Sequence, residues 1–440
     1  MGTSPPDRAA STALLTDQYE LTMVQAALAS GAADRRCVFE VFARSLPRRR
    51  RYGVVAGLGR LMQLLPDFRF DDDALDFLGA HEVVDDATRR WLSSYRFSGS
   101  IEAYAEGEVY LPESPVLSVE GTFAECVVLE TLVLSVLNHD SAVAGAAARM
   151  IVAAGDRPCI EMGSRRTHEE SAVAAARAAY LAGFATTSNL QAGQVWGVPT
   201  AGTAAHAFTL VHDDELSAFR AQVASLGEGT TLLVDTFDVT QGIRRAVDAA
   251  GPSLGAVRLD SGDLGLQAHQ VRRLLDELGA RDTRIVVTGD LDEFAIAGLT
   301  SAPVDAYGVG TSIVTGSGAP TAGFVYKLVA RERSDGTMEA VEKRSPGKIS
   351  HGGRKLATRR HDASGTALLE VVRTGPVRPP RDDERALQVP VMRDGEPLEI
   401  ASLAEARKRC RASRDALPPE ALKLSQGDPA IPTVFEEAGP

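Results

Sequence analysis

The chain has 440 residues, 44% of them hydrophobic and 24% charged, which is typical of a soluble globular protein with a large core. Its formal net charge of -12 opposes non-specific binding to nucleic acid or to an anionic membrane, so we expect neither as a partner. The four cysteines have no metal-ligand spacing and indicate buried thiols in a reducing compartment. We find no signal peptide and no apolar run of membrane-spanning length, and we expect a cytoplasmic protein.

Residues 1–114 predict a mixed unit of helices and antiparallel strands. The first helix is expected over residues 14–29, with Thr16 or Asp17 as its cap, Glu20 completing a capping box, and Gly31 ending it. The remaining predicted elements are a strand at 37–43, helices at 53–65 and 71–78, and a hairpin over 96–111 that turns at Glu106 and Gly107.

Residues 115–322 have a different pattern. Two long apolar helices are expected at 123–137 and 141–154. Short strands then alternate with helices: strands at 159–163, 200–208, 231–234, 256–259, 284–288 and 306–309, and helices at 169–182, 243–250, 267–278 and 292–299. Such alternation predicts parallel strands with helical crossovers and an active site at the carboxyl ends of the strands.

Residues 323–440 return to strands and turns. Strands are predicted at 325–331, 338–343, 356–360 and 367–373, and a last helix at 401–417. The apolar periodicity is too weak for a separate core, so these elements are expected to complete the N-terminal unit. The proline-rich end is expected to form a loose C-terminal arm. The chain contains no internal repeat.

Three predicted strands run into loops rich in Gly, Ser, Thr and Asp, at Val257–Asp263, Val286–Asp290 and Tyr307–Thr311. The first loop carries Asp260 and Asp263, which could bind hydrated Mg²⁺ and ribose hydroxyls. The alternative is a turn that caps the following helix. The other two loops, with Gly289, Asp290, Gly310 and Thr311, offer backbone N–H donors suited to a phosphate.

Arg165 and Arg166 follow another strand end and could hold two different anionic groups, since the guanidinium fork matches a carboxylate. The alternative is an ion pair with Glu161, Glu169 or Glu170.

His206 follows the segment Thr200–Ala205, at a position where a reactive side chain would lie. A histidine at a strand end can be a nucleophile or a structural polar residue, and His139 and His168 compete with it. No two histidines have zinc-site spacing. The segment Asp235–Asp238 is typical of a helix cap, and we assign it no catalytic role.

Taken together, these motifs resemble the nicotinate phosphoribosyltransferase family. The resemblance rests on seven segments in the family's order: Leu15–Met23, Glu161–Arg166, Thr187–Gly193, Gly202–His206, Val257–Leu264, Tyr307–Thr311 and Val325–Val329. It implies an irregular α/β barrel of the type II phosphoribosyltransferase kind, with a mixed α/β domain built from both chain ends. The implied reaction forms nicotinate mononucleotide and pyrophosphate from nicotinate and phosphoribosyl pyrophosphate. It is coupled to ATP hydrolysis through a phosphohistidine and belongs to NAD biosynthesis and salvage by the Preiss–Handler pathway.

The resemblance also implies roles for individual residues. His206 corresponds to the histidine that ATP phosphorylates, and Arg165 to the arginine that faces the nicotinate carboxylate. Tyr19 corresponds to a tyrosine that stacks on the nicotinate ring from the neighbouring subunit of a homodimer; the alternative is that Tyr19 packs in its own subunit's core. Ser188 is assigned to the nicotinate site. The phosphoribosyl pyrophosphate site comprises Arg258, Asp260, Asp263, Gly289, Asp290, Gly310 and Thr311, with Asp260 and Asp263 as the Mg²⁺ residues.

The sequence disfavours three other functions. Nicotinamide phosphoribosyltransferases place an aspartate in the segment that corresponds to Thr187–Gly193, whereas this chain has Ser188 and Asn189, which favours the acid as substrate. A non-catalytic phosphate-binding protein is disfavoured because His206 and Arg165 are intact. A phosphosugar aldolase would need a Schiff-base lysine at a strand end, and none of the predicted strand ends supplies one.

Overall fold

The computed structural model describes residues 11–343, 351–375 and 379–437, and it divides the chain into two compact units. The first unit combines residues 1–141 with residues 321–440, and the second comprises residues 142–320. The first boundary therefore lies later than the expected one after residue 114. The reason is that strand β5 (Leu117–Thr122) pairs with β1 (Arg36–Ala43) of the first unit, which keeps the segment after residue 114 in that unit.

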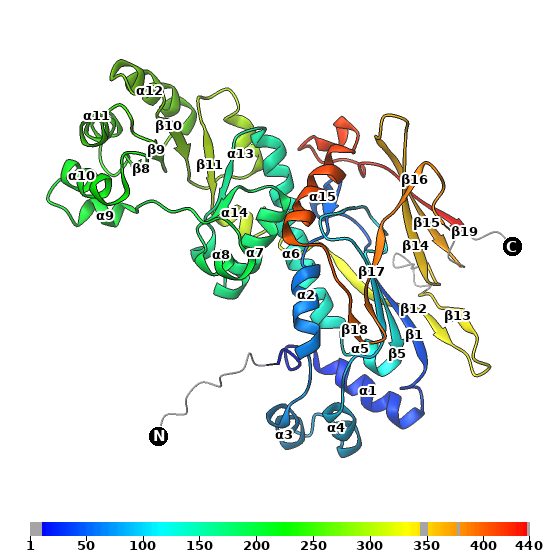
Figure 1. Cartoon of the computed structure of the whole chain (residues 1–440). Coiled ribbons are helices and arrows are strands. Elements are labelled where there is room, and N and C mark those ends of the chain that lie inside the picture. The colour runs from blue at the N-terminus through cyan, green and yellow to red at the C-terminus, as the bar shows by residue number, and fades with distance from the viewer. Residues whose placement is uncertain (1–10, 344–350, 376–378, 438–440) are drawn as a thin grey trace. The chain divides into compact units, whose positions relative to one another are not determined.

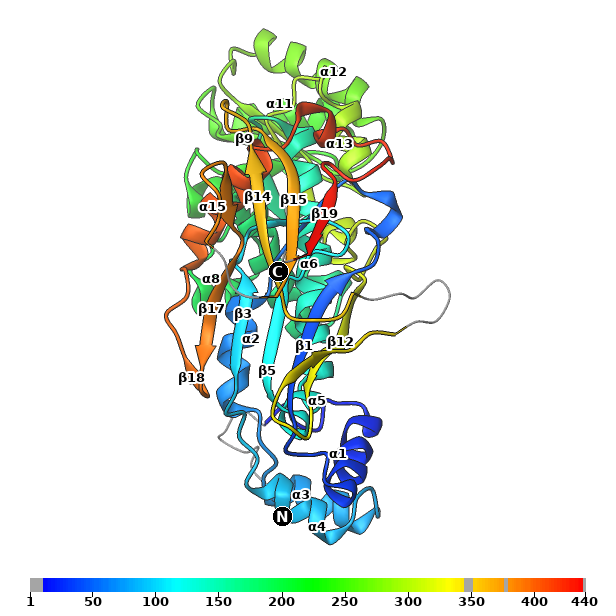
Figure 2. The ribbon, with the colours of Figure 1, turned by 90° about the vertical axis from the view of Figure 1, so that its right-hand side faces the viewer.

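The main sheet of the first unit has seven antiparallel strands in the order β13-β12-β1-β5-β3-β17-β18, and Figure 2 shows β3, β5, β1 and β12 side by side. Besides β1 and β5, its strands are β3 (Ser100–Tyr104), β12 (Phe324–Glu332), β13 (Met338–Ala340), β17 (Gln388–Arg393) and β18 (Glu396–Pro397). The core on this sheet includes Phe39 and Tyr326, whose rings stack with centroids 4.9 Å apart. The expected strands at 37–43 and 325–331 are confirmed.

A four-stranded sheet in the same unit has the order β16-β14-β15-β19. Its strands are β14 (Lys355–His361), β15 (Ala367–Thr374), β16 (Glu384–Ala386) and β19 (Thr433–Glu437). Strand β19 lies parallel to β15, so the expectation of a loose C-terminal arm is wrong for the described residues up to Glu437. Backbone pairing with β15 fixes the described residues of β19. The sequence could not predict this, because pairing between distant segments leaves no local pattern in a short polar stretch.

A buried ion network lies at Arg359 of β14, a side chain that is 1% exposed. Its Nη1 donates to Glu108 at 2.6 Å and its Nη2 to Glu370 at 2.8 Å. Burial alone would raise the pKa of Glu108, but Arg359 and Arg385 lower it to about 2. The network joins segments from both ends of the chain within one unit, and removing one partner would leave a buried charge uncompensated.

The predicted hairpin over residues 96–111 does not form. Strand β4 (Val109–Tyr110) pairs with β2 (Gly53–Val54), while β3 pairs with β5 and β17. Glu106 instead accepts hydrogen bonds from the backbone N–H groups of Gly57 and Gly59, at the start of α2 (Leu58–Leu64). The expected helix over 53–65 is accordingly confined to α2 and a 3-10 turn, Leu65–Asp67.

Helix α1 (Gln18–Ser30) ends at Gly31, whose φ of 73° is the left-handed conformation expected there. Glu20 does not complete a capping box; its carboxylate is buried and accepts hydrogen bonds from Thr131 and Thr16. The other helices of this unit are α3 (Asp72–Ala80), α4 (Asp86–Ser93), α5 (Phe123–Val127) and α15 (Leu403–Asp415), with 3-10 turns at Pro47–Arg49 and Pro419–Leu422.

The stretch Phe123–Ala154, which includes α6 (Glu130–Ala154), is long and apolar enough to span a membrane by length and composition. The expectation that no run reaches that length is therefore wrong. The structure buries 67% of the most apolar window, as in the core helix of a globular protein.

The second unit contains a parallel sheet with the order β7-β6-β11-β10-β9-β8, which forms a curled half-barrel (Figure 1). Its strands are β6 (Cys159–Glu161), β7 (Thr186–Thr187), β8 (Thr231–Leu233), β9 (Ala256–Leu259), β10 (Arg284–Val287) and β11 (Ala306–Val309). Its helices are α7 (Glu169–Ala182), α8 (Leu190–Trp196), α9 (His206–Leu210), α10 (Glu215–Leu226), α11 (Val239–Ala250), α12 (Leu264–Glu277), α13 (Glu293–Gly298) and α14 (Thr311–Val314), with a 3-10 turn at Ser164–Arg166. The predicted α/β alternation is confirmed.

One predicted strand, over residues 200–208, is wrong. Thr200 makes only an isolated bridge to Thr187, residues 201–205 form a loop, and His206 begins helix α9. The apolar Ala-rich sequence favours a strand, but after this bridge the backbone pairs with no strand of the sheet, and its contact with β9 is a side-chain hydrogen bond from Arg258 to Thr203.

Candidate active site

All six strands of the second unit are parallel, so their carboxyl ends meet at one edge of the sheet. The segment after each strand carries polar or glycine residues. The candidate residues that belong to these strands, the segments after them and the start of α9 are Arg165, Ser188, His206, Arg258, Asp260, Asp263, Gly289, Asp290, Gly310 and Thr311. Tyr19 belongs to the first unit.

His206 is held from two sides at the start of α9. Its Nδ1 lies 3.0 Å from the hydroxyl oxygen of Thr236, and its Nε2 lies 3.9 Å from Oδ1 of Asp235. The His206 side chain is 40% exposed, whereas that of Asp235 is 2% exposed. The imidazole is therefore partly exposed, and its Nε2, which lies near a buried carboxylate but beyond hydrogen-bond distance of it, has no hydrogen bond to a described residue.

Asp235 is the functional candidate that sequence reasoning missed. Its Oδ2 accepts hydrogen bonds from the backbone N–H of Asp260, at 2.7 Å, and from the Ser261 hydroxyl. Its Oδ1 is buried and has no hydrogen-bond partner among the described residues. A buried acceptor without a partner is costly, and here it faces the imidazole that can carry positive charge. Asp238, four positions into the same segment, does cap α11 as expected.

Two arginines lie close enough to repel each other. Arg258 on β9 is half-buried, and this desolvation lowers its pKa; Asp260 and Asp235 oppose that effect, and the charge of Arg165 adds to it. Arg165 and Arg166 form no hydrogen bond or ion pair with the residues that the structure describes, so the alternative of an ion pair with neighbouring glutamates is not observed. Like charges brought together at an exposed edge favour binding of an anion.

Glu161, one of those glutamates, is fully buried and accepts hydrogen bonds from the Thr187 hydroxyl and the Gly163 backbone N–H. Burial raises its pKa. The neighbouring loop is fastened by Asn189, whose side chain donates to the Ser164 hydroxyl at 3.0 Å. Ser188 is exposed beside it, on the same edge.

The loops after β9 and β10 are packed against each other. The Asp260 carboxylate accepts a hydrogen bond from the Thr288 hydroxyl. Gly289 has a φ of 106°, and a Cβ there would lie 2.3 Å from the Asp260 carbonyl oxygen, so only glycine fits. Asp290 follows with a positive φ of 44°. This tight turn is typical of a loop that presents its backbone to a ligand.

Asp263 caps α12, because its Oδ1 accepts a hydrogen bond from the Leu266 backbone N–H at 3.0 Å. The helix-cap alternative is thus correct for one oxygen of this carboxylate, and the residue remains exposed. Gly310 and Thr311 lie at the beginning of α14, where Thr311 is also exposed.

Tyr19, in the first turn of α1, is 46% exposed and is not a core residue. Partial burial, together with the charges of Glu130 and Glu20, raises the pKa of Tyr19 to about 12. The phenol therefore stays neutral, and much of the side chain is open.

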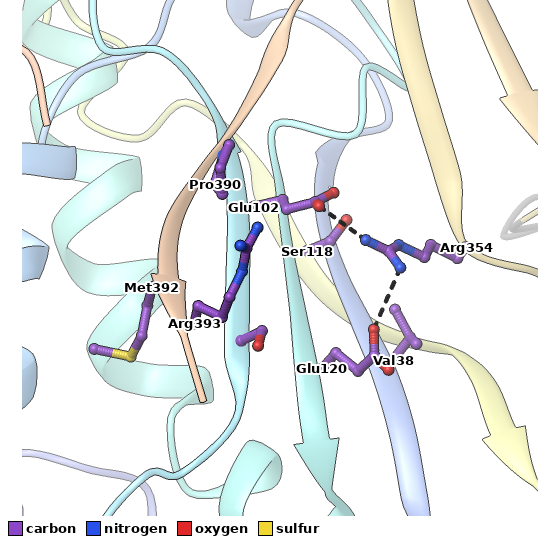
Figure 3. A pocket seen from close by; sticks show the side chains of 9 residues that line it. Val38, Glu102, Ser118, Glu120, Arg354, Pro390, Met392 and Arg393 are labelled. Carbon is purple, nitrogen blue, oxygen red and sulfur yellow. Dashed lines mark ion pairs between the residues drawn. The ribbon is translucent and has the colours of Figure 1, made fainter. Parts of the chain in front are cut away.

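A cavity in the first unit, shown in Figure 3, is not a candidate for this chemistry. Arg354 borders it and forms ion pairs with Glu102 at 2.9 Å and Glu120 at 3.5 Å, so its charges balance within the cavity wall. None of the candidate site residues lines it.

A parallel α/β half-barrel with arginines, carboxylates, tight glycine turns and an accessible histidine at its carboxyl edge has the architecture of α/β-barrel enzymes, whose active sites lie at that edge. Comparison with known proteins gives the family. A family model described as the nicotinate phosphoribosyltransferase (NAPRTase) N-terminal domain matches residues 14–138.

The chain is 59% identical to a nicotinate phosphoribosyltransferase of Mycobacterium tuberculosis, over 97% of this chain and 96% of that protein. It is 35% identical to the nicotinate phosphoribosyltransferase of Bacillus subtilis, over 79% of this chain and 73% of that one. The crystal structure of human nicotinic acid phosphoribosyltransferase superposes with a TM-score of 0.81 and 26% identity, covering 96% of this chain and 97% of the human chain. The chain belongs to the nicotinate phosphoribosyltransferase family, and the fold that the resemblance implied is confirmed.

Proposed function

We propose that this protein transfers the phosphoribosyl group of phosphoribosyl pyrophosphate to nicotinate, and that ATP hydrolysis through phosphorylated His206 is coupled to the transfer. The observation that carries the ATP coupling is the accessible imidazole of His206, backed at 3.9 Å by the buried carboxylate of Asp235. Family membership supports the transfer itself. In this reaction the ring nitrogen of nicotinate forms a bond to ribose C1 as the bond from C1 to the pyrophosphate oxygen breaks.

The protein's part in this transfer is to position the reactants and to stabilise charge. Arg165 would face the nicotinate carboxylate, with Ser188 on the same edge. Arg258 would attract the anionic groups of phosphoribosyl pyrophosphate, and Asp260 would accept hydrogen bonds from ribose hydroxyls. Gly289, Asp290, Gly310 and Thr311 would surround the 5'-phosphate.

ATP would phosphorylate His206 in a separate step. A ring nitrogen forms a bond to the γ-phosphorus as the bond to the bridging oxygen breaks and ADP leaves, and water later releases phosphate. Thr236 holds the ring orientation, and Asp235 stabilises positive charge on the imidazole.

Mg²⁺ fits this site only as an ion that the protein shares with the substrate. Among the described residues no group of three His, Cys, Asp or Glu side chains is placed to hold a metal ion. Asp260 and Asp263 would therefore hold Mg²⁺ through water, together with oxygens of the substrate, which is the usual coordination of this ion. When bound it neutralises the charge of the leaving pyrophosphate.

We also propose a homodimer in which Tyr19 reaches the nicotinate of the neighbouring subunit, which its 46% exposure supports. Participation in the Preiss–Handler route to NAD, a cytoplasmic location and the absence of nucleic-acid or membrane partners remain predictions.

The function is tested by measuring product formation from nicotinate or nicotinamide with phosphoribosyl pyrophosphate, each with and without ATP. We expect nicotinate mononucleotide to form, faster at low substrate concentration when ATP is present, and little product from nicotinamide. Preference for nicotinamide would overturn the proposed substrate, and indifference to ATP would overturn the coupling.

Arg165→Ala is expected to weaken nicotinate binding with little change for phosphoribosyl pyrophosphate. A bidentate contact with a carboxylate is worth ~1.5 to 3 kcal/mol, so the KM for nicotinate should rise by roughly 10- to 150-fold. Arg244→Ala, on the exposed face of α11, is the control and should leave both KM values unchanged. Equal losses for both substrates would mark Arg165 as a phosphate ligand or a structural residue.

A further inference from the structure

The loop that carries His206 has no helix or strand between residues 201 and 205, yet it is tied to the sheet at both ends. At its beginning the Ala201 backbone N–H donates to the Thr187 carbonyl at 2.9 Å. At its end the Nδ1 of His206 lies 3.0 Å from the hydroxyl oxygen of Thr236. The position of the loop therefore depends on few contacts, each with a different strand or strand end.

One side-chain contact ties the middle of this loop. Arg258 of β9 donates from Nη1 to the hydroxyl oxygen of Thr203 at 2.8 Å, between residues 55 positions apart in the chain. Thr203 is exposed, and its neighbours in the loop are glycine and alanine, so no other side chain in the loop's middle could make such a bond.

Arg258 uses only part of its hydrogen-bonding capacity in this contact. Its Nε is buried and has no hydrogen-bond partner among the described residues, and its Nη2 donates to none of them. Nε and Nη2 form the side-on edge of a guanidinium, the edge that receives two oxygens of a carboxylate or phosphate. The bond to Thr203 therefore leaves the nitrogens of this edge without an acceptor among the described residues and restrains the rest of the group.

We propose that Thr203 is a positioning residue that couples, through Arg258, the anionic substrate at the carboxyl edge to the loop that carries His206. The inference rests on the proposed function, because it takes phosphoribosyl pyrophosphate as the anion and ATP as the phosphoryl donor to His206. It adds a residue and a physical link that the proposed function does not require.

The link works in both directions. A restrained Arg258 loses less conformational freedom when it binds an anion, which strengthens binding. An anion that fixes Arg258 in turn fixes Thr203 and the loop. Coupling between two ligand events is reciprocal, so phosphorylation of His206 that orders the loop should tighten the binding of phosphoribosyl pyrophosphate by way of the same bond.

The test uses the full-length protein and the KM for phosphoribosyl pyrophosphate, measured without and with ATP. The ratio of these two values measures the coupling. In Thr203→Val, which keeps the shape but removes the acceptor, the ratio should fall by roughly 3- to 10-fold, the effect of one hydrogen bond to a charged group at a partly exposed site. Thr203→Ser retains the hydroxyl and should restore the ratio. Thr240→Val, an exposed threonine of α11, is the matched control and should keep the wild-type ratio.

A folded Thr203→Val protein with the wild-type ratio overturns the inference. An equal rise of the KM for phosphoribosyl pyrophosphate without and with ATP also overturns it, because such a rise would mark a purely structural role. Thr203→Ala provides the same measurement if the valine variant fails to fold. If wild-type protein shows neither labelled His206 nor any effect of ATP, the proposed coupling fails and the inference fails with it. Labelled wild-type protein with an unchanged ratio in the variants overturns the inference alone.

Discussion

His206→Ala is expected to abolish ATP hydrolysis and the stimulation by ATP, while slow ATP-independent synthesis of nicotinate mononucleotide continues. The variant removes the imidazole that the structure places beside Asp235, but it leaves the arginines and loop carboxylates that are proposed to bind the substrates. Incubation with γ-labelled ATP should give the wild-type protein an acid-labile phosphate and give the variant none.

His269→Ala is the matched control, because His269 is exposed on α12 and has no part in the proposed site. It should be labelled as fully as the wild type. Equal labelling of His206→Ala would show that another residue accepts the phosphoryl group. Complete loss of ATP-independent synthesis in a folded variant would show instead that His206 also acts in the transfer step.

Mixing Tyr19→Ala with His206→Ala is expected to restore ATP-coupled synthesis that neither variant has alone. If Tyr19 stacks on nicotinate across a dimer interface, each mixed dimer contains one site with both wild-type residues and one site with neither. The two proteins are refolded together. The activity of the heterodimers should approach half that of an equal amount of wild-type dimer, because one of their two sites is intact. The exposure of the Tyr19 ring makes it available for such a role.

Tyr19→Phe keeps the ring and loses only the hydroxyl, so it should retain most of the activity and serves as the control. If heterodimers form but no activity returns, Tyr19 acts within its own subunit. Activity of Tyr19→Ala alone at the wild-type level would remove Tyr19 from the site altogether.

Much of the second unit could be predicted from the sequence because the signals are local. Short β-branched runs followed by glycine and aspartate mark where strands end, and side-chain caps such as Asp238 mark where helices begin. Once the strands are parallel, topology forces their carboxyl ends to one edge. Arg165 and Asp260 could therefore be placed at one edge of the sheet before any distance was known, and the family resemblance added Arg258.

The predictions that the structure overturns have a common cause. Residues far away in the chain compete with the local interactions that the sequence pattern predicts. Glu20 has the spacing of a capping box, but its carboxylate is bound by Thr131, 111 positions away. The expected hairpin at Glu106 has a good turn sequence, yet β3 and β4 each find another strand. Helices α4, α8 and α10 were missed because short or weakly periodic segments give little signal before they pack.

The sequence by itself determined the family, the alternation of strands and helices in the second unit, and most of the residue types at the carboxyl edge, because these depend on motifs and on local backbone preference. The tertiary structure decided which of those residues meet. It places Asp235 behind His206 and Thr203 against Arg258, and it assigns one oxygen of Asp263 to a helix cap. Such contacts depend on how the loops cross the ends of the strands, which a local pattern cannot specify, since hydrogen bonds between side chains far apart in the chain form only when the whole sheet is in place.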